Sequence, residues 1–350
     1  MKNNTFAELG EVLREEKNFI IFTHISGDAD TLGTGTALCK ALRNLNKKAY
    51  IAVEDEVARN LKFLDWDRED DFPMMIFFDE FEQSSENFHW RDSYLDDEKK
   101  NGYVSICVDC GDFTRFPKRE SLFKNGKITM CIDHHKTTEP FCDYNYIDPE
   151  AAATAEIIYG VLVENGIAIT EEIAKSIFAG ITTDTGNFQY SNTRKLTHEI
   201  VAKLYDIRDN YNDVSVEIYE TSPVSRLLLQ SDIIGKLELF SSGKGCISYV
   251  TQEMLKFRDA QIDDSEGVVS ALRSIDGVEV AAFLKERQEG DIKVSLRAKN
   301  DVDVAEISQR SGGGGHRKAA GFSLDMPMNE AVEFVRKQLE SVLDCRKANM

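Results

Sequence analysis

Apolar and polar residues alternate along the N-terminal half of the chain in segments that predict strands and helices in turn. Three short runs rich in β-branched and aromatic residues, at 18–23, 104–109 and 128–133, predict buried strands. In 5–16 and 151–164, apolar residues instead recur every three to four positions, which predicts amphipathic helices. Strands that alternate with helices are typical of an α/β fold with a doubly wound, mostly parallel sheet.

The same patterns predict the remaining elements of this half. Two further strands are predicted at 50–53 and 74–78. The further predicted helices are one that follows Gly33 and Gly35 and turns Leu38, Leu42 and Leu45 inward, and others at 57–64, 171–181 and 195–207. The segment 66–100 is acidic and irregular, and we interpret it as an elaborated surface segment without an assigned role.

Beyond Arg226 the order of the predicted elements changes, which indicates a second, smaller α/β domain with a mixed sheet. The predicted helices lie at 227–239, 266–274, 304–309 and 328–343, and the predicted strands at 246–250, 278–284, 292–297 and 319–324. We therefore divide the chain into an N-terminal domain (1–191), a helical linker or hinge (192–225) and a C-terminal domain (226–350). A cleft is expected between the two domains.

Composition narrows the class of protein. With 42% hydrophobic and 29% charged residues, the 350-residue chain is typical of soluble globular proteins. It has no apolar stretch long enough to span a membrane, and residues 1–6 lack the apolar core of a signal peptide, so a cytoplasmic location is predicted. The net charge of -19 argues against binding to long duplex nucleic acid, although small phosphorylated substrates remain possible.

The seven cysteines form no evident framework. Their odd number favours reduced thiols. Cys107 and Cys110 form a CxxC pair, but no second pair lies at the spacing of a zinc ribbon. We interpret them as a strand residue and a loop residue on either side of Asp109.

Aspartate and histidine residues follow four apolar segments of the N-terminal half. The segments lead to His24, Asp28 and Asp30, to Asp109, to Asp133, His134 and His135, and to Asp184. Taken alone, each could be a turn or helix-capping Asp beside surface histidines. Four such segments together favour convergence on one metal-bearing cleft.

The ligand types indicate which metals this cleft would hold. Asp28 and Asp30 stand two apart, and in an extended segment they would point to the same side. Carboxylate oxygens with only one or two imidazoles suit manganese, magnesium or iron better than a thiolate zinc site does. Two such ions, about 3.5 to 4 Å apart, would share a bridging carboxylate and activate a water for in-line attack at phosphorus.

A run of four glycines marks the C-terminal domain. Gly312, Gly313, Gly314 and Gly315 follow a predicted helix and could form its C-cap and a flexible turn. Because His316 follows directly, they could instead form a nest of backbone amides for an anion, with the imidazole as a further donor. Arg115, just beyond Asp109, could make either a salt bridge or a substrate contact.

Together these motifs resemble those of a known family. His24-Ile-Ser-Gly-Asp28-Ala-Asp30, Asp109, Asp133-His134-His135 and Asp184 look like the ordered motifs of the DHH phosphoesterases. The run 312–316 followed by Ala319-Ala320-Gly321 resembles the signature of their DHH-associated C-terminal domain. Within this family the chain is most similar to the stand-alone bacterial nanoRNases and pAp phosphatases.

The resemblance implies a role for each matching residue. It implies that His24 and Asp28 hold one metal, that Asp30, His134 and Asp184 hold the other, and that Asp109 bridges the two. Asp133 would orient a neighbouring imidazole, and His135 would face the scissile phosphate. The glycines 312–315 and His316 would hold a substrate phosphate, with Arg297 reaching it bidentately unless that arginine is only a solvated strand end.

The implied activity is that of a metal-dependent phosphodiesterase with two divalent ions, manganese being favoured over magnesium or iron. Its substrates would be very short 5′-phosphorylated RNA, cut to nucleoside monophosphates, and also the 3′-phosphate of pAp. A cyclic di-AMP or pApA phosphodiesterase would need the same residues, and a non-catalytic nucleotide sensor could keep the fold. The resemblance leaves open whether the protein is a homodimer.

Overall fold

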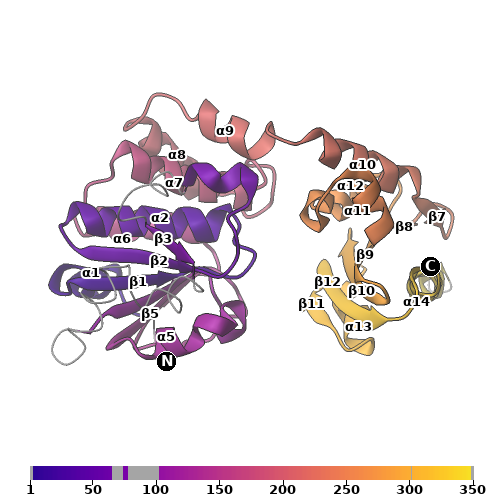
Figure 1. Ribbon diagram of the computed structural model, residues 1–350, viewed down its shortest axis with the longest axis horizontal. Coiled ribbons are helices and arrows are strands. Elements are labelled where there is room, and N and C mark those ends of the chain that lie inside the picture. The colour runs from indigo at the N-terminus through magenta and orange to yellow at the C-terminus, as the bar shows by residue number, and fades with distance from the viewer. Residues whose placement is uncertain (1–2, 65–73, 78–101, 301, 348–350) are drawn as a thin grey trace. The chain divides into compact units, whose positions relative to one another are not determined.

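The structure is a computed structural model that describes residues 3–64, 74–77, 102–300 and 302–347. The chain forms two compact units, an N-terminal unit of residues 1–221 and a C-terminal unit of residues 222–350, each with its own sheet (Figure 1). The division falls inside the segment predicted as a linker. The roles predicted for segments 1–191, 192–225 and 226–350 stay predictions. The expected cleft between the domains also stays a prediction.

Six parallel strands form the sheet of the N-terminal unit, in the order β3-β2-β1-β4-β5-β6. The strands are β1 (Asn18–Phe22), β2 (Lys48–Val53), β3 (Met75–Phe77), β4 (Val104–Val108), β5 (Ile128–Asp133) and β6 (Tyr144–Ile147). The chain runs outward from β1 through β2 and β3, then continues on the other side of β1 with β4, β5 and β6. Ligand sites of such sheets lie beyond the carboxyl ends of the strands at this reversal, which here separates β1 from β4.

Helices precede, connect and follow these strands. They are α1 (Phe6–Glu15), α2 (Ala29–Asn44), α5 (Glu120–Lys124), α6 (Thr154–Glu164), α7 (Glu171–Asp184), α8 (Lys195–Tyr205) and α9 (Asn212–Tyr219), with short 3-10 helices η1 (Arg59–Leu64), η2 (Phe113–Arg115) and η3 (Pro117–Arg119). The doubly wound, parallel α/β fold predicted for this part is confirmed.

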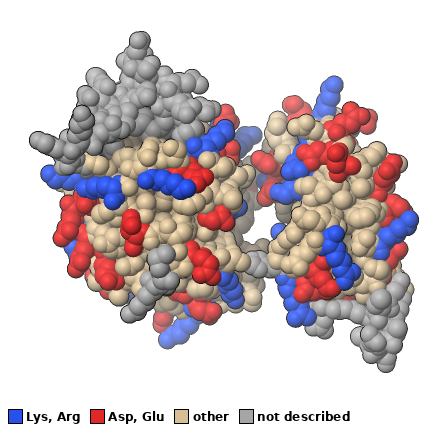
Figure 2. All heavy atoms as spheres, turned by 90° about the horizontal axis from the view of Figure 1, so that it is seen from below, with Lys and Arg blue, Asp and Glu red and all other residues tan. Residues whose placement is uncertain are grey.

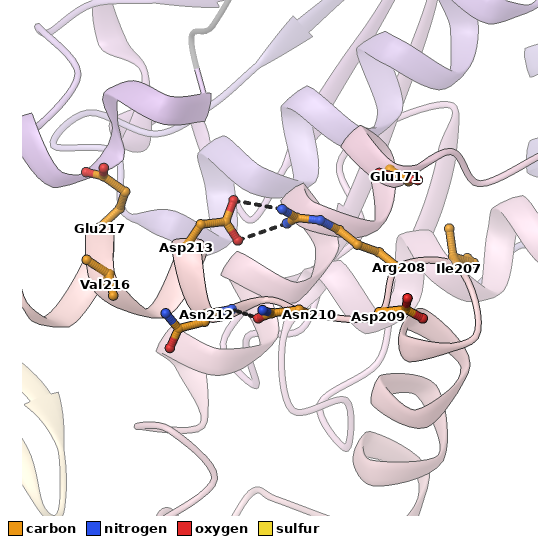
Figure 3. A pocket seen from close by; sticks show the side chains of 9 residues that line it. All are labelled: Glu171, Ile207, Arg208, Asp209, Asn210, Asn212, Asp213, Val216 and Glu217. Carbon is orange, nitrogen blue, oxygen red and sulfur yellow. Dashed lines mark hydrogen bonds and ion pairs between the residues drawn. The ribbon is translucent and has the colours of Figure 1, made fainter.

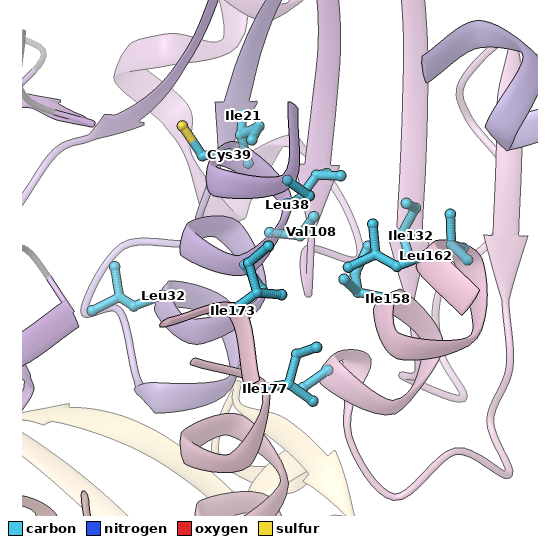
Figure 4. Close-up of a cluster of buried hydrophobic side chains, with 14 of the residues drawn as sticks. Ile21, Leu32, Leu38, Cys39, Val108, Ile132, Ile158, Leu162, Ile173 and Ile177 are labelled. Carbon is cyan, nitrogen blue, oxygen red and sulfur yellow. The ribbon is translucent and has the colours of Figure 1, made fainter. Parts of the chain in front are cut away.

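Successive side chains of the central strands point to opposite faces of the sheet. In β1, Phe19 and Ile21 belong to the core beneath α2, α6 and α7, part of which Figure 4 shows. Ile20 and Phe22 belong to a second core on the α5 side. Each large apolar side chain buried in this way contributes about 1.5–3 kcal/mol. Both faces are therefore covered, which explains why these strands read as continuous apolar runs.

Two glycines allow α2 and α7 to pack closely. A Cβ atom on Gly33 would lie 2.5 Å from the carbonyl oxygen of Ser176, in the facing helix. A Cβ atom on Gly180 would lie 2.7 Å from Oδ1 of Asp30 and 2.8 Å from the Cβ of Ala155. Real side chains do not approach so closely, so both positions require glycine as packed here.

The C-terminal unit has a mixed sheet, as predicted, with six strands in the order β11-β12-β10-β9-β8-β7 where four were predicted. Among the described strands of this unit, β8 and β9 pair in parallel and the other neighbours pair antiparallel. The strands are β7 (Glu238–Phe240), β8 (Gly245–Val250), β9 (Val280–Gln288), β10 (Asp291–Ala298), β11 (Gly314–His316) and β12 (Ala319–Asp325). The helices are α10 (Val224–Gly235), α11 (Gln252–Arg258), α12 (Val268–Ser274), α13 (Val304–Arg310) and α14 (Met328–Lys347), with the 3-10 helix η4 (Ile262–Ser265).

Some predicted elements differ from the structure. The helix predicted at 227–239 ends at Gly235 and gives way to β7, and the sequence patterns did not reveal β6, α11 or β11. Leu45 was predicted to face inward but is 39% exposed, because α2 has already ended at Asn44. Most of the acidic segment 66–100 lies outside the described residues, which include only 74–77 of it.

Among the described helices, none has the length and apolar character needed to cross a membrane. Figure 2 shows acidic and basic side chains interspersed over the face that it presents.

Candidate metal centre

The carboxyl ends of three neighbouring strands bring the predicted ligands together. His24 follows β1, Asp109 follows β4 and His134 follows β5, and these strands pair in parallel in the order β1-β4-β5. Two helices complete the group, because Asp30 lies in the first turn of α2 and Asp184 is the last residue of α7. Residues far apart in the sequence thus meet at one edge of the sheet.

Asp109 lies between two sets of potential ligands. Its Oδ2 is 3.5 Å from Nε2 of His24, and its Oδ1 is 3.6 Å from Nε2 of His134. The residue has a left-handed backbone conformation, with φ of 58°. Aspartate tolerates this conformation better than most residues, and such strain is concentrated at functional sites. The backbone therefore turns sharply after β4 and presents one carboxylate oxygen to each side.

The potential ligand atoms fall into overlapping groups, each with atoms within 4.8 Å of one another. The groups are His24, Asp28 and Asp109, then Asp30, His134 and Asp184, and then Asp109, His134 and His135. The first two match the division into two ion sites that the family resemblance implies. Ion binding by these residues remains a prediction.

The local geometry of Asp28 and Asp30 differs from the expected extended segment. Asp28 is the N-cap of α2, and its Oδ1 accepts hydrogen bonds from the amides of Asp30 and Thr31. Its other oxygen, Oδ2, lies 3.5 Å from Nε2 of His24. The capping role and the ligand position therefore coexist in one side chain. Asp30 reaches the site from inside the helix, because the chain turns into α2 at once.

Backbone carbonyls hold the two ligand histidines in orientations suited to metal binding. Nδ1 of His24 lies 2.7 Å from the carbonyl oxygen of Ile25, and Nδ1 of His134 lies 3.2 Å from that of Ala151. A carbonyl can only accept, so each Nδ1 carries the proton and each neutral ring keeps its Nε2 lone pair. Nε2 of His24 is buried and has no hydrogen-bond partner in the described part of the chain. A divalent cation fits such a donor set.

The electrostatics of the cluster favour bound cations. Burial raises the pKa of Asp30 well above its usual range, and the charges of Asp109 and Asp184 add to this effect. Burial lowers the pKa of His24, but the adjacent carboxylates Asp109 and Asp28 outweigh burial and raise it to about 10. Both shifts favour bound protons in the absence of metal, and divalent cations held by the same side chains would take the place of those protons.

Asp133 orients His135. The carboxylate Oδ1 of Asp133 lies 2.8 Å from Nδ1 of His135, and Thr138 donates a short hydrogen bond to Oδ2. The hydrogen bond that His135 Nδ1 donates to Asp133 raises the pKa of His135 by more than burial lowers it. The His135 side chain is 42% exposed, so the ring lies partly at the surface. One of its nitrogens, Nδ1, is held by Asp133.

The start of α6 holds two of the carboxylates, which the sequence patterns did not reveal. Its N-cap, Ala153, offers no capping side chain, and Asp30 instead accepts the amides of Thr154 (2.7 Å) and Ala155 (3.0 Å). The hydroxyl of Thr154 donates to Oδ1 of Asp109 at 3.1 Å. Threonine at a helix start reads as an ordinary cap in the sequence, so only the three-dimensional contact identifies Thr154.

The predicted substrate residues of the C-terminal unit lie around β12. Arg297 of β10 and His316 of β11 both pair with Ala319, one from each side. The glycine run was expected to form a flexible turn or an amide nest, but its last two glycines form the edge strand β11. A Cβ atom on Gly313 would lie 2.2 Å from the carbonyl oxygen of Gly321, so close backbone packing explains that glycine.

Arg115 lies beside the loop that carries His24. Its carbonyl oxygen accepts a hydrogen bond from the amide of Ile25 at 2.7 Å. The guanidinium forms no ion pair with any described residue, so the salt bridge considered for Arg115 is not formed within that part of the chain.

A pocket of about 680 Å³ lies elsewhere in the N-terminal unit (Figure 3). Arg208 forms two hydrogen bonds with Asp213 at its wall, of 3.0 and 2.9 Å, and Glu171, Asp209 and Glu217 also line it. The pocket shares no residue with the predicted ligand groups.

Comparison with known proteins identifies the family of this chain. The model of the DHH family, N-terminal domain, matches residues 18–181, and that of the DHHA1 domain matches residues 243–344. The chain belongs to the DHH/DHHA1 phosphoesterases, as the motifs predicted.

The chain is similar to bifunctional oligoribonuclease and PAP phosphatase NrnA from two organisms. It is 28% identical to that of Thermus thermophilus over 337 residues, which cover 95% of this chain and 93% of the relative. It is 24% identical to that of Bacillus subtilis over 308 residues, covering 87% and 88%. It is thus a DHH-family phosphoesterase related to NrnA.

Solved structures share the fold. An exopolyphosphatase-related protein from Bacteroides fragilis superimposes with a TM-score of 0.86 at 24% identity, covering 98% of this chain and 97% of that one. RecJ from Thermus thermophilus, in complex with Mn²⁺, gives a TM-score of 0.53 at 14% identity, covering 97% of this chain and 54% of that one.

Proposed function

We propose that this protein is a metal-dependent phosphodiesterase that hydrolyses very short 5′-phosphorylated oligoribonucleotides to nucleoside monophosphates, and that it also removes the 3′-phosphate of pAp. The oligoribonuclease and PAP phosphatase activities named for its relatives support this substrate class. Two divalent ions, manganese in preference to magnesium or iron, are the proposed cofactors.

One observation carries the proposal. Asp109 directs one carboxylate oxygen toward the group of His24 and Asp28 and the other toward the group of His134 and Asp184. A carboxylate in this position can bridge two cations, which is the arrangement that phosphoester hydrolysis uses. Bound there, the two ions would lower the pKa of a water and neutralise charge on the phosphate.

The side chains around this centre have distinct proposed roles. Asp133 fixes the ring of His135 through Nδ1, which leaves Nε2 as the atom available to a phosphate oxygen. Because the hydrogen bond that Nδ1 donates to Asp133 raises the pKa of His135, the protonated ring that can donate from Nε2 is favoured. Arg115, beside the His24 loop, is proposed to contact the substrate.

The C-terminal unit is proposed to hold the far end of the substrate. Arg297 and His316 occupy matching register positions on either side of Ala319, with the glycines 312–315 leading into the same edge of the sheet. A guanidinium can bind a phosphate bidentately. Glycine residues have no side chains, which lets a phosphate approach their backbone closely. A phosphate held by these residues is proposed to contribute to the preference for short substrates.

A substrate panel tests the proposal. Purified protein with Mn²⁺, or with excess chelator, is offered pAp, pApA, cyclic di-AMP, pyrophosphate and 5′-phosphorylated RNA of increasing length from the dinucleotide. The highest kcat/KM is expected for the shortest RNA, with pAp also cleaved and all turnover lost in chelator. A preference for cyclic di-AMP or pApA would replace the proposed substrate, and binding without turnover would indicate a nucleotide sensor.

A further inference from the structure

The loop that follows α7 returns to the metal centre through Asn192. The side-chain Nδ2 of Asn192 donates to the carbonyl oxygen of Asp184 and to that of Ala152, both at 3.0 Å. Asp184 ends α7, where carbonyl groups lack helical partners, and Ala152 lies just before α6. One amide group therefore connects the end of α7 with the approach to α6.

These two contacts connect the backbone segments that support two ligands of one predicted ion site, His134 and Asp184. His134 is held through Nδ1 by the carbonyl of Ala151, the neighbour of Ala152, and its Nε2 lies 3.2 Å from Oδ2 of Asp184. Both ligands are thus supported by backbone that Asn192 fixes. If the Asn192 contacts were lost, Asp184 and the Ala151 carbonyl could move independently.

A second contact from the same loop secures the same turn. The amide of Ala152 donates to Oε2 of Glu156 at 3.0 Å, and Glu156 is almost fully buried. Arg194, two residues after Asn192, approaches that carboxylate oxygen at 3.5 Å. The turn at Ala152 is therefore held by its carbonyl and by its amide, and both supports involve residues of the segment 192–194.

We infer that Asn192 is a positioning residue, which sets the separation of His134 and Asp184 and so determines the affinity of the Asp30, His134 and Asp184 group for a divalent cation. Asn192 is not one of the predicted ligands, and it acts through two backbone carbonyls. The inference rests on the proposed two-metal function. It further predicts that the His24 and Asp28 group, supported by other contacts, does not depend on Asn192.

Calorimetric titration with Mn²⁺ alone, without substrate, tests the inference on the full chain. Wild-type protein is expected to bind two ions, and Asn192→Ala is expected to weaken one of the two by about 10- to 100-fold, the usual effect of removing support behind a ligand. Asn192→Asp, which keeps the shape but has no N–H donors, is expected to weaken it at least as much. With the preferred substrate of the panel, the Mn²⁺ concentration for half-maximal activity should rise while KM stays unchanged.

Asn145→Ala is the matched control. Asn145 is a buried asparagine of β6 whose side chain also bonds backbone groups, at Phe141 and Cys142. This variant should lower the melting temperature without changing either Mn²⁺ affinity. Unchanged Mn²⁺ binding in both Asn192 variants would overturn the inference, as would equal weakening in Asn145→Ala. Failure of the wild-type protein to bind Mn²⁺ would instead overturn the proposed function.

Discussion

The two units differ in where they bury charge. Six Asp, Glu, Arg and His residues in the described part of the chain are buried as whole residues, and all lie in the N-terminal unit: His24, Asp30, Asp109, Arg119, Asp133 and Glu156. In the C-terminal unit, the buried polar side chains among the described residues are serines: Ser248, Ser265 and Ser308. Burial of an ionic group is costly unless it is paired or binds a metal. The N-terminal unit accepts this cost where the proposed chemistry takes place.

This difference suggests that the N-terminal unit carries the catalytic step and the C-terminal unit contributes to substrate binding. Substitutions at the buried carboxylates of the N-terminal unit should reduce turnover, whereas substitutions at the proposed phosphate-binding positions of the C-terminal unit should weaken substrate binding. Enzyme kinetics distinguishes the two, because loss of uniform binding raises KM, and loss of transition-state stabilisation lowers kcat.

Asp109→Asn is expected to have the largest effect. The amide keeps the shape and tolerates the left-handed backbone at this position, but it removes the charge that would bridge two cations. We expect kcat to fall by at least about 10²–10³-fold with the fold retained. Circular dichroism and steady-state kinetics measure both, with Asp112→Asn, an exposed cap of η2, as the control. Wild-type turnover in Asp109→Asn would refute the bridging role.

Thr154→Val tests the contact between α6 and Asp109. Valine keeps the volume and the backbone amide that binds Asp30, and it loses only the hydroxyl that donates to Asp109. Loss of such an outer contact should lower kcat by about 10- to 100-fold. Thr154→Ser, which restores the hydroxyl, should recover most of the activity. Equal loss in both variants would show that side-chain packing, and not the hydrogen bond, matters.

Arg297→Ala tests the C-terminal unit. Loss of one charged hydrogen bond to a phosphate, of about 1.5 kcal/mol, should raise KM about tenfold and leave kcat nearly unchanged. Lys293→Ala removes an exposed cation from the same strand and should leave both constants unchanged. A fall in kcat for Arg297→Ala, with KM unaltered, would break the proposed division between the units.

The smallest expected effect concerns an ion pair remote from the centre. Burial raises the pKa of Asp213, but hydrogen bonds from Arg208 outweigh it and hold the pKa below its ordinary 3.8. A carboxyl group whose pKa is lower in the folded protein than in the unfolded protein stabilises the fold at any pH above its unfolded-state pKa. This stabilisation is lost as the pH falls through the folded-state pKa. Asp213→Asn should therefore lower the free energy of unfolding by under about 1 kcal/mol at neutral pH.

Urea unfolding at pH 7 and at steps below pH 4 measures this difference. The gap between wild type and variant should close in acid. Asp232→Asn, which breaks the equivalent pair with Arg258 in the C-terminal unit, should behave alike, because Arg258 also lowers the pKa of Asp232. A gap that persists in acid would show that charge pairing is not its cause.

Much of the fold and of the ligand cluster could be predicted because strong local patterns encode them. The strand at 128–133 has the predicted bounds, since an apolar run buried on both faces ends abruptly at Asp133. Thr154 and Asn192 could not be predicted, because their partners are backbone or carboxylate groups brought near by packing between helices. The edge strand β11 consists of glycines and His316, so main-chain pairing forms it without any apolar alternation.

The glycine contact between α2 and α7 makes the geometry of the centre depend on positions that carry no chemistry. Asp30 and Asp184 lie on helices whose backbones meet at Gly33, and Gly180 leaves room for the carboxylate of Asp30 itself. An added methyl group at Gly33 would push α2 away from α7, and one at Gly180 would displace the carboxylate of Asp30 or the start of α6, so either would disturb the predicted ligands. Tolerance to mutation should therefore be lowest not only at the acids but also at these two residues, which never touch an ion or a nucleotide.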